Sequence, residues 1–386
     1  MRHTCEDNIL TIYLEGNFDT NNSDQIGAQM QELKDQYPDA KLVIDAEDLV
    51  YISSAGLRQI LKMKKKVKDL KIINCSSEVY EVFSMTGFSE MMDIEKGYRH
   101  VSVEGCEKIG EGSNGIVYRI NPDTIVKVYK NSDALDDIKR ERELARTALV
   151  MGINTAIPFD VVKVGDKYGS IFELLSAKSI TRLVKDNPDD KDKYIRIFAD
   201  MLKEIHATPV KEGVLPNARA TVIGWAKWLE SHLPEESFRK LVALTEGIPE
   251  HHFVLHGDYH TNNVHYADNE AILIDMDTLS EGYPIIEFAS VFMAYRGYGE
   301  LDHDKVEKFL EIEWDLAGYI LEKLMEFYFD GKDKDFIDSV MDKARVIGYT
   351  RGLRRTIKRE SDNVELIDHY KKQLIELIDK VDTLLY

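Results

Sequence analysis

One stretch of the sequence, residues 256–277, constrains this chain more than any other. It reads H-G-D-Y-H-T-N-N-V-H-Y-A-D-N-E-A-I-L-I-D-M-D. Asp258 and Asn263 have the spacing Asp-x-x-x-x-Asn, and Asp275 follows the apolar run Ala-Ile-Leu-Ile. Because Asp, Asn and Gly also mark ordinary turns, Asp258 and Asn263 alone do not decide between a turn and a reactive site. The rest of the chain has to decide.

These residue types are the ones that phosphoryl transfer from ATP requires. One Asp accepts or orients the proton of the attacking hydroxyl, and an Asn and a second Asp hold the Mg²⁺ that neutralises the phosphates. The Asp-to-Asn spacing is also that of kinase catalytic loops. The stretch therefore favours phosphoryl transfer, provided that a phosphate-binding segment occurs elsewhere in the chain.

Length and charge set the outer limits. A chain of 386 residues is long enough for two or three domains, each with its own core. The hydrophobic fraction of 44% and the charged fraction of 31% are ordinary for a globular protein. The net charge of −19 argues against nucleic acid and anionic membranes as partners, since both are bound through basic surface.

Cysteine usage and the N-terminus indicate the compartment. Cys5, Cys75 and Cys106 are too few and too scattered for a disulfide framework or a Cys-rich metal site. The N-terminus lacks an apolar signal core, and no run approaches the roughly 18–20 apolar residues of a membrane span. We therefore expect a cytoplasmic protein.

The first hundred residues alternate between strand and helix patterns. Strands are predicted at 9–15, 42–45 and 70–74, and helices at 24–37 and 78–85. Between the last two strands, Leu57, Ile60, Leu61 and Val67 recur at helical spacing, with lysines on the other face. Such alternation predicts an α/β domain.

Ser53 and Ser54 lie where this central helix begins, and two interpretations are open. Serine is a favoured N-cap, because its hydroxyl accepts a hydrogen bond from a free backbone N–H. Alternatively, an exposed hydroxyl there receives a phosphate, whose charge the N-terminus of a helix tolerates.

Three segments of this region resemble the STAS domain of anti-sigma factor antagonists. They are L-E-G-N-F-D-T-N-N, L-V-I-D-A-E-D-L-V-Y-I-S-S-A-G-L-R-Q-I-L and T-G-F-S-E-M. The resemblance implies a STAS domain over residues 1–98, with an anti-sigma factor or another STAS-binding protein as partner. It also implies that Ser54 is the candidate phosphorylation site. Members with that switch often carry Asp before the serine, where this chain has Ser53.

A second domain is predicted from residue 103, after a polar stretch punctuated by Gly97. Gly110, Gly112 and Gly115 form G-x-G-x-x-G, whose glycines let the backbone approach phosphates. The motif precedes strand-like sequence rather than a helix, which argues against a dinucleotide-binding turn. Lys127 lies in the next strand, where a kinase places the lysine that contacts the α- and β-phosphates.

The partner of Lys127 should come from the helix that follows and ends at Gly152. Glu143 is the candidate, with Glu141 nearly as plausible from spacing. Further strands are predicted at 161–164 and 169–175, then a hinge, then helical sequence from 179 onward. A basic cluster also stands out late in the chain and reads either as a solvated helix face or as a docking site for phosphate or a partner: Arg351, Arg354, Arg355, Lys358 and Arg359.

From about Val103 onward, the order of these parts resembles the aminoglycoside phosphotransferase and choline-kinase-like family, a branch of the protein-kinase-like fold. H-G-D-Y-H-T-N-N matches its H-G-D-x-H-x-x-N loop, and I-D-M-D its I-D-[WFY]-[DE] segment; Glu287 stands where Asp is usual. The resemblance implies a two-lobed α+β domain over 103–386, with an N-lobe at about 103–175 and a helical C-lobe at about 179–386.

The same resemblance implies a role for each matched residue. Asp258 would be the catalytic base, Asn263 and Asp275 the Mg²⁺ ligands, and Lys127 with Glu143 the phosphate-positioning pair. Glu143 is preferred over Glu141 for its distance from Gly152, and Asp277 is carried over less firmly. The implied cofactors are ATP and Mg²⁺.

Three functions remain open from the sequence. The first is an active phosphotransferase whose hydroxyl acceptor is a small molecule or a protein serine, Ser54 included. The second is a regulatory protein of the anti-sigma factor antagonist type whose kinase-like part senses nucleotide or ligand. The third is aminoglycoside phosphorylation, which nothing in the sequence specifies.

Overall fold

The computed structural model describes residues 1–112 and 114–386, and the chain divides into two compact units. The first comprises Met1–Ser102 with Val161–Asp166, and the second comprises Val103–Asp160 and Lys167–Tyr386. Residues 161–166 group with the first unit because Lys163 exchanges backbone hydrogen bonds with Arg99 and Val101. Within the described ranges, no helix combines the length and apolar character needed to cross a membrane.

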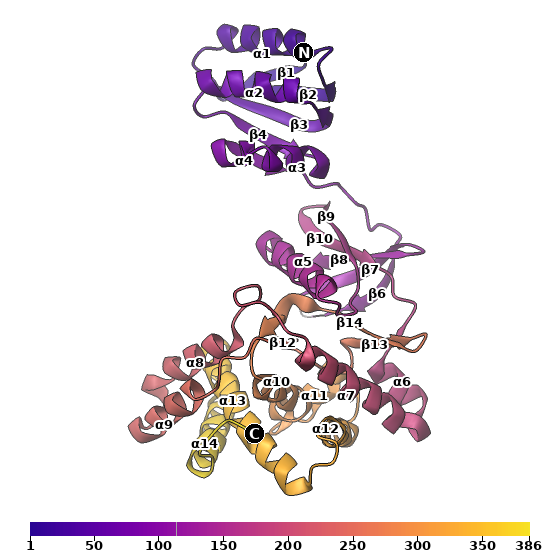
Figure 1. The fold of residues 1–386 in the computed structure, drawn as a ribbon, viewed down its shortest axis with the longest axis vertical. Coiled ribbons are helices and arrows are strands. Elements are labelled where there is room, and N and C mark those ends of the chain that lie inside the picture. The colour runs from indigo at the N-terminus through magenta and orange to yellow at the C-terminus, as the bar shows by residue number, and fades with distance from the viewer. Residues whose placement is uncertain (113) are drawn as a thin grey trace. The chain divides into compact units, whose positions relative to one another are not determined.

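The first unit is a five-stranded sheet in the order β1-β2-β3-β4-β5, in which only β1 runs antiparallel to its neighbour (Figure 1). Alternate apolar residues of β2 and β3, such as Leu10 and Ile44, enter a core shared with the helices. The elements are β1 (His3–Glu6), β2 (Ile9–Phe18), α1 (Ser23–Gln36), β3 (Lys41–Ile52), α2 (Ser54–Lys66), β4 (Lys71–Cys75), α3 (Ser77–Met85), α4 (Phe88–Met91) and β5 (Asp93–Lys96).

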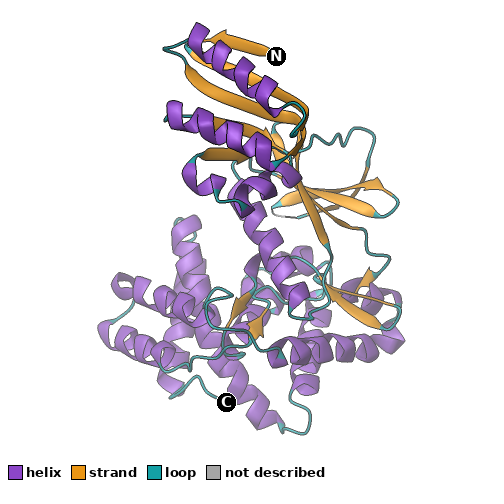
Figure 2. Ribbon diagram, turned by 45° about the horizontal axis from the view of Figure 1, so that its top comes forward, coloured by secondary structure: helices purple, strands orange, loops and turns teal. Residues whose placement is uncertain are grey.

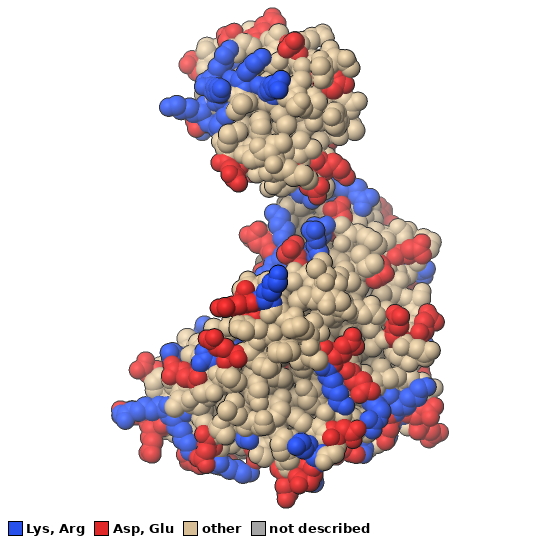
Figure 3. Space-filling model, in the orientation of Figure 1, with Lys and Arg blue, Asp and Glu red and all other residues tan. Residues whose placement is uncertain are grey.

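The predicted alternation of strands and helices in this unit is confirmed, and one strand is longer than predicted. β3 continues to Ile52 because its second half pairs with β2 through two register shifts, while its charged residues hide the strand pattern. The lysines of α2 occupy its exposed face, and Figure 3 shows basic side chains gathered on one face of this unit.

The second unit has a sheet-bearing part and a large group of helices, seen in orange and purple in Figure 2. Its first sheet has the order β6-β7-β8-β10-β9, and α5 contacts β10. The elements are β6 (Glu107–Glu111), β7 (Gly115–Asn121), β8 (Thr124–Tyr129), α5 (Leu135–Val150), β9 (Pro158–Val164) and β10 (Lys167–Glu173). The turn between β7 and β8 is formed by Pro122 and Asp123, as the N-P-D sequence indicates.

Helices dominate from Ile180 onward, with two small sheets, β11-β13-β14 and β12-β15, between them. The predicted helical C-terminal region is confirmed. Its elements are β11 (Lys178–Ser179), α6 (Ile180–Asp186), α7 (Lys191–Ala207), α8 (Ala218–Trp228), α9 (Glu235–Glu246), β12 (Val254–Leu255), β13 (Val264–Ala267), β14 (Glu270–Leu273), β15 (Ser280–Glu281), α10 (Ile285–Tyr295), α11 (Asp304–Leu310), α12 (Trp314–Tyr328), α13 (Lys334–Arg359) and α14 (Val364–Lys380).

One large core joins these helices to the small sheets and is centred on α10, whose residues are almost all buried. α10 contacts α8, α11, α12 and α13, so it is surrounded by helices. The loop from β12 to β13, which carries residues 256–263, lies against this core. That loop is therefore supported by a closely packed part of the unit.

Candidate active site

Lys127 is held between two carboxylates that come from different parts of the second unit. Its Nζ lies 2.9 Å from Glu141 Oε1 on α5 and 2.8 Å from Asp275 Oδ1, just after β14. Burial alone would lower the pKa of Lys127, but Asp275 and Glu141 raise it above its usual value. The ammonium is thus charged and fixed in position between the sheet, α5 and the segment after β14.

The predicted pairing of Lys127 with Glu143 is wrong, because Glu141 takes that place. Glu143 is exposed, whereas Glu141 is 4% exposed. Two residues along a helix turn the side chain by about 200°, so the two glutamates point to opposite sides of α5. Glu141 therefore faces the sheet, and Glu143 faces solvent.

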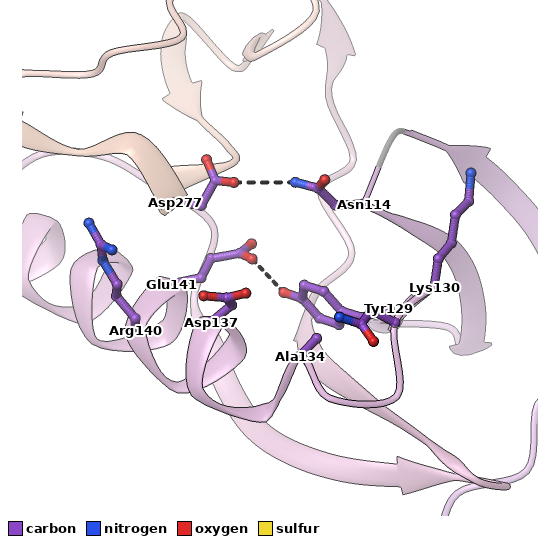
Figure 4. Close-up of a pocket in the computed structure, with 9 residues that line it drawn as sticks. Asn114, Tyr129, Lys130, Ala134, Asp137, Arg140, Glu141 and Asp277 are labelled. Carbon is purple, nitrogen blue, oxygen red and sulfur yellow. Dashed lines mark hydrogen bonds between the residues drawn. The ribbon is translucent and has the colours of Figure 1, made fainter. Parts of the chain in front are cut away.

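Tyr129 is a site residue that the sequence reasoning missed. Its hydroxyl donates a hydrogen bond of 2.5 Å to Glu141 Oε2, so each oxygen of Glu141 has its own donor (Figure 4). The signal was available: Lys127 and Tyr129 are two apart on β8 and so share one face of the strand. Burial and the Glu141 charge raise the pKa of Tyr129, which keeps it a neutral donor.

Asp258 and Asn263 lie together in the loop between β12 and β13. Asn263 is 6% exposed, and its Nδ2 donates to the backbone carbonyl of Asp258 at 3.0 Å. The carbonyl oxygen of the Asn263 side chain is therefore the atom left to accept a hydrogen bond or a cation. Burial acts to raise the pKa of Asp258, but His260, His256 and Arg351 lower it below its usual value. Asp258 is thus ionised at neutral pH.

Glu287, which replaces the more usual Asp, fixes the start of this loop. Fully buried on α10, it accepts backbone hydrogen bonds from His256 at 2.5 Å and from Gly257 at 3.0 Å. Gly257 has a φ of +83°, and a Cβ there would lie 2.6 Å from the carbonyl oxygen of Thr278. The loop therefore needs glycine at 257 and a carboxylate at 287, which together orient Asp258.

Asp275 and Asp277 follow β14 in a short turn. Asp275 has a φ of 64° and a ψ of 66°, a left-handed conformation that non-glycine residues seldom adopt. Burial raises the pKa of Asp277 to about 7, with further contributions from Asp275 and Glu141 that Lys127 partly offsets. Negative charge thus exceeds positive charge at this point.

The donor set fits a magnesium ion. No three His, Cys, Asp or Glu side chains of the described residues converge into a complete metal cluster. Mg²⁺ is usually bound through one or two protein carboxylates and completes its shell with water and substrate phosphates. Asn263 and Asp275 would supply oxygen donors of the right kind, and the excess of carboxylates would favour a cation there.

A cavity of about 330 Å³ opens beside the Lys127 network. Its residues come from the glycine-rich segment, the end of β8, α5 and the turn after β14. Figure 4 shows Asn114 pointing toward Asp277, to which its Nδ2 donates at 3.4 Å. The lining consists of Asn114, Tyr129, Lys130, Asn131, Ala134, Asp137, Arg140, Glu141 and Asp277.

The glycine motif flanks this cavity. Gly110 lies in β6 and Gly115 begins β7, where a Cβ would lie 2.7 Å from the carbonyl oxygen of Val128. Gly112 donates its N–H to the carbonyl of Gly115 at 2.9 Å, which closes the hairpin. Gly115 is thus required for the close approach of β7 and β8, and a Cβ at Gly112 would meet no atom within 4 Å.

In the first unit, the two roles that the sequence leaves open at the N-terminus of α2, helix cap and exposed hydroxyl, fall on different serines. Ser53 is the cap, since its Oγ accepts the N–H of Gly56 at 3.3 Å. Ser54 is the first residue of α2 and is exposed. The capping role therefore falls on Ser53 and leaves the hydroxyl of Ser54 accessible.

We predict that Asp277→Asn stabilises the second unit in a pH-dependent way. The unfolded carboxyl ionises near pH 4 and the folded one at about 7. Between these values the folded state keeps a proton that the unfolded state has lost, so wild-type stability falls as pH rises. The variant should gain on the order of 1–2 kcal/mol at pH 8, discounted for partial exposure, and much less below pH 5.

Urea denaturation at pH 5 and pH 8 measures this difference. Asp137→Asn is the matched control, because Asp137 lines the same cavity but is exposed. An equal gain in stability at both pH values, or the same response in the control, would contradict the raised pKa of Asp277.

Comparison with known proteins gives two family matches. The family model described as "Phosphotransferase enzyme family" matches residues 105–319, and the STAS domain model matches residues 2–102. BtrV of Bordetella bronchiseptica, named as an anti-sigma factor antagonist, is 30% identical over 92 residues, which cover 23% of this chain and 78% of BtrV.

Solved structures of aminoglycoside phosphotransferases are similar at low identity. The streptomycin–ATP ternary complex of APH(2″)-IIa aligns with 18% identity and a TM-score of 0.47 over 70% of this chain and 92% of that one. A thermostable APH(4)-Ia mutant with ADP and hygromycin B aligns with 12% identity and a TM-score of 0.49 over 72% and 96%. Because the first family model matches more than half of this chain, the chain belongs to the phosphotransferase enzyme family, and it carries an N-terminal STAS domain.

Proposed function

We propose that this chain is an ATP- and Mg²⁺-dependent phosphotransferase that moves the γ-phosphoryl group of ATP to a hydroxyl acceptor, under the influence of its STAS domain. We further propose that the STAS domain occupies residues 1–98 and the kinase-like domain residues 103–386, and that the protein is cytoplasmic. The observation that carries the proposal is Lys127, held charged between Glu141 and Asp275 beside the glycine-rich hairpin.

The residues divide the work as follows. Lys127 is positioned to bind the nucleotide phosphates, since a fixed ammonium there stabilises their charge. Asn263 and Asp275 would hold Mg²⁺, which when bound neutralises charge on the transferred phosphoryl group. Asp258, ionised and oriented through Glu287 and Gly257, accepts the proton of the attacking hydroxyl.

The first unit supports a regulatory role. Its match to the STAS model and to BtrV favours binding of a protein partner such as an anti-sigma factor. Ser54 is exposed at the N-terminus of α2, where the partial positive charge of the helix stabilises an added phosphate. We propose Ser54 as a phosphorylation site. The alternative function is that of a regulator of the anti-sigma factor antagonist type whose kinase-like domain only senses nucleotide or ligand.

We predict that Glu141→Gln and Glu143→Gln differ sharply in activity. Glu141→Gln removes the charge that positions Lys127 and should lower the rate of Mg²⁺-ATP turnover by about 10–100-fold. Glu143→Gln changes an exposed side chain on the same helix and should stay within about 2-fold of wild type. ADP release at saturating ATP measures both, with circular dichroism as a folding control. Similar losses in both variants would refute the role given to Glu141.

The proposed function is tested by intact-mass and peptide analysis after incubation with Mg²⁺-ATP. ADP formation by the wild type, and its reduction by at least about 100-fold in Asp258→Asn, is the expected result. Self-phosphorylation of the STAS domain would add a phosphoryl mass to the peptide with Ser54, and Ser54→Ala would remove it. Equal ADP formation by wild type and Asp258→Asn, with nucleotide still bound, would favour the sensor alternative.

A further inference from the structure

The basic cluster on α13 does not form a uniform solvated face. Arg351 is half-buried, and its Nη1 donates to Ser290 Oγ on α10 at 2.7 Å. Ser290 in turn donates to the backbone carbonyl of Gly257 at 2.6 Å. Two hydrogen bonds therefore connect the guanidinium of Arg351 to the residue that immediately precedes Asp258.

Two tryptophans of α8 form an aromatic wall along the same side of α13. The guanidinium carbon of Arg351 lies 5.7 Å from the centre of the Trp225 ring. Further along the helix, Arg354 and Lys358 lie 5.8 Å and 5.1 Å from the ring of Trp228. Both tryptophans are half-buried, so they limit the side-chain positions of these cations.

These cations lack the carboxylate partners that an acidic chain could easily supply. Among the described residues, no Asp or Glu forms a salt bridge with Arg351, Arg354 or Lys358, although the net charge is −19. The Nε of Arg354 is buried without a hydrogen-bond partner in this part of the chain. Arg351 and Arg354 are half-buried, and a partly desolvated cation without a counter-charge is costly unless a ligand supplies the opposite charge.

The charge of Arg351 reaches the reacting centre. It is one of the groups that lower the pKa of Asp258, after burial, which acts in the opposite direction, and after His260 and His256. A cationic acceptor docking beside Asp258 would be repelled by this charge. An acceptor with a phosphate or carboxylate would instead receive two parallel hydrogen bonds from the guanidinium, the geometry in which Arg binds such groups best.

We propose that the acceptor is an anionic small-molecule alcohol whose phosphate or carboxylate binds Arg351, with Arg354 and the two tryptophans forming the rest of its site. The inference rests on the proposed function and deepens it by assigning the class of acceptor. In the transfer, the acceptor oxygen forms a bond to the γ-phosphorus and its proton passes to Asp258. The bond from that phosphorus to the β–γ bridging oxygen breaks, and ADP leaves with the electron pair.

The experiment uses the full chain, γ-labelled ATP and Mg²⁺. The probes are small molecules from a bacterial extract, freed of nucleotides and separated at pH 7 into anionic, neutral and cationic fractions before the reaction. Labelled small-molecule product should form with the anionic fraction alone. Arg351→Gln should lower the rate at limiting concentrations of that fraction by at least about 10-fold, mainly through KM, and Arg351→Lys should recover part of the loss.

Arg359→Gln is the matched control, because Arg359 is the exposed last residue of α13 and has no part in the site. It removes the same charge from the same helix and should stay within about 2-fold of wild type.

The outcomes separate the two proposals. Label transfer with the neutral or cationic fraction, or to protein alone, would overturn the anionic acceptor while leaving phosphotransfer intact. An equal loss in Arg351→Gln and Arg359→Gln, or a loss in kcat with KM unchanged, would overturn the role of Arg351. No transfer with any fraction, and no difference between wild type and Asp258→Asn, would refute the proposed function itself.

Discussion

The ion pairs of Lys127 hold together the sheet, α5 and the turn after β14, and the geometry of the candidate site depends on this connection. One ammonium links β8 to α5 through Glu141 and to the turn after β14 through Asp275. Removing one partner from such a buried pair leaves an uncompensated charge and typically costs about 3–5 kcal/mol. Tyr129 adds a neutral donor to Glu141, so the carboxylate is fixed on both oxygens. The arrangement ties the positions of β8, α5 and the turn after β14 to one another.

A second constraint acts on the loop that carries Asp258. At the start of the loop, Glu287 accepts hydrogen bonds from the backbone of His256 and Gly257. At its end, the side chain of Asn263 donates a hydrogen bond to the carbonyl of Asp258. Neither contact involves the carboxylate of Asp258, which is left to solvent and His260. The scaffold therefore fixes the backbone and leaves the carboxylate oxygen atoms of Asp258 available. Around Asp277, carboxylates outnumber cationic side chains, so a bound cation would balance the charge there.

Much of this could be predicted from the sequence, because the motifs fix local geometry. The strand and helix alternation of the first unit, the glycine hairpin and Lys127 on the following strand all follow from pattern and turn chemistry. The predicted partner of Lys127 is Glu143 rather than Glu141 because nothing in the sequence shows which side of α5 packs on the sheet. The two glutamates lie only two residues apart on a helix rich in charge. The same limit applies to Ser53 and Ser54. Their roles depend on the first residue of α2, which the sequence does not fix to within one position.

Arg351 shows a deeper limit. Its significance comes from Ser290 on α10 and Trp225 on α8, which are 61 and 126 residues away in the chain. A sequence pattern shows a basic stripe but not whether another helix covers it. Tertiary packing turned one end of that stripe toward the catalytic loop and left Arg359 exposed at the other.

We propose that Asp275, which belongs to the Lys127 network, is also a ligand of Mg²⁺. The most direct test is the affinity for ATP, measured by calorimetry with and without Mg²⁺, for the wild type and Asp275→Asn. We expect Mg²⁺ to tighten ATP binding to the wild type by at least about 10-fold and the variant to bind ATP with little response to Mg²⁺. An unchanged Mg²⁺ response in Asp275→Asn would refute the role of Asp275 as a metal ligand.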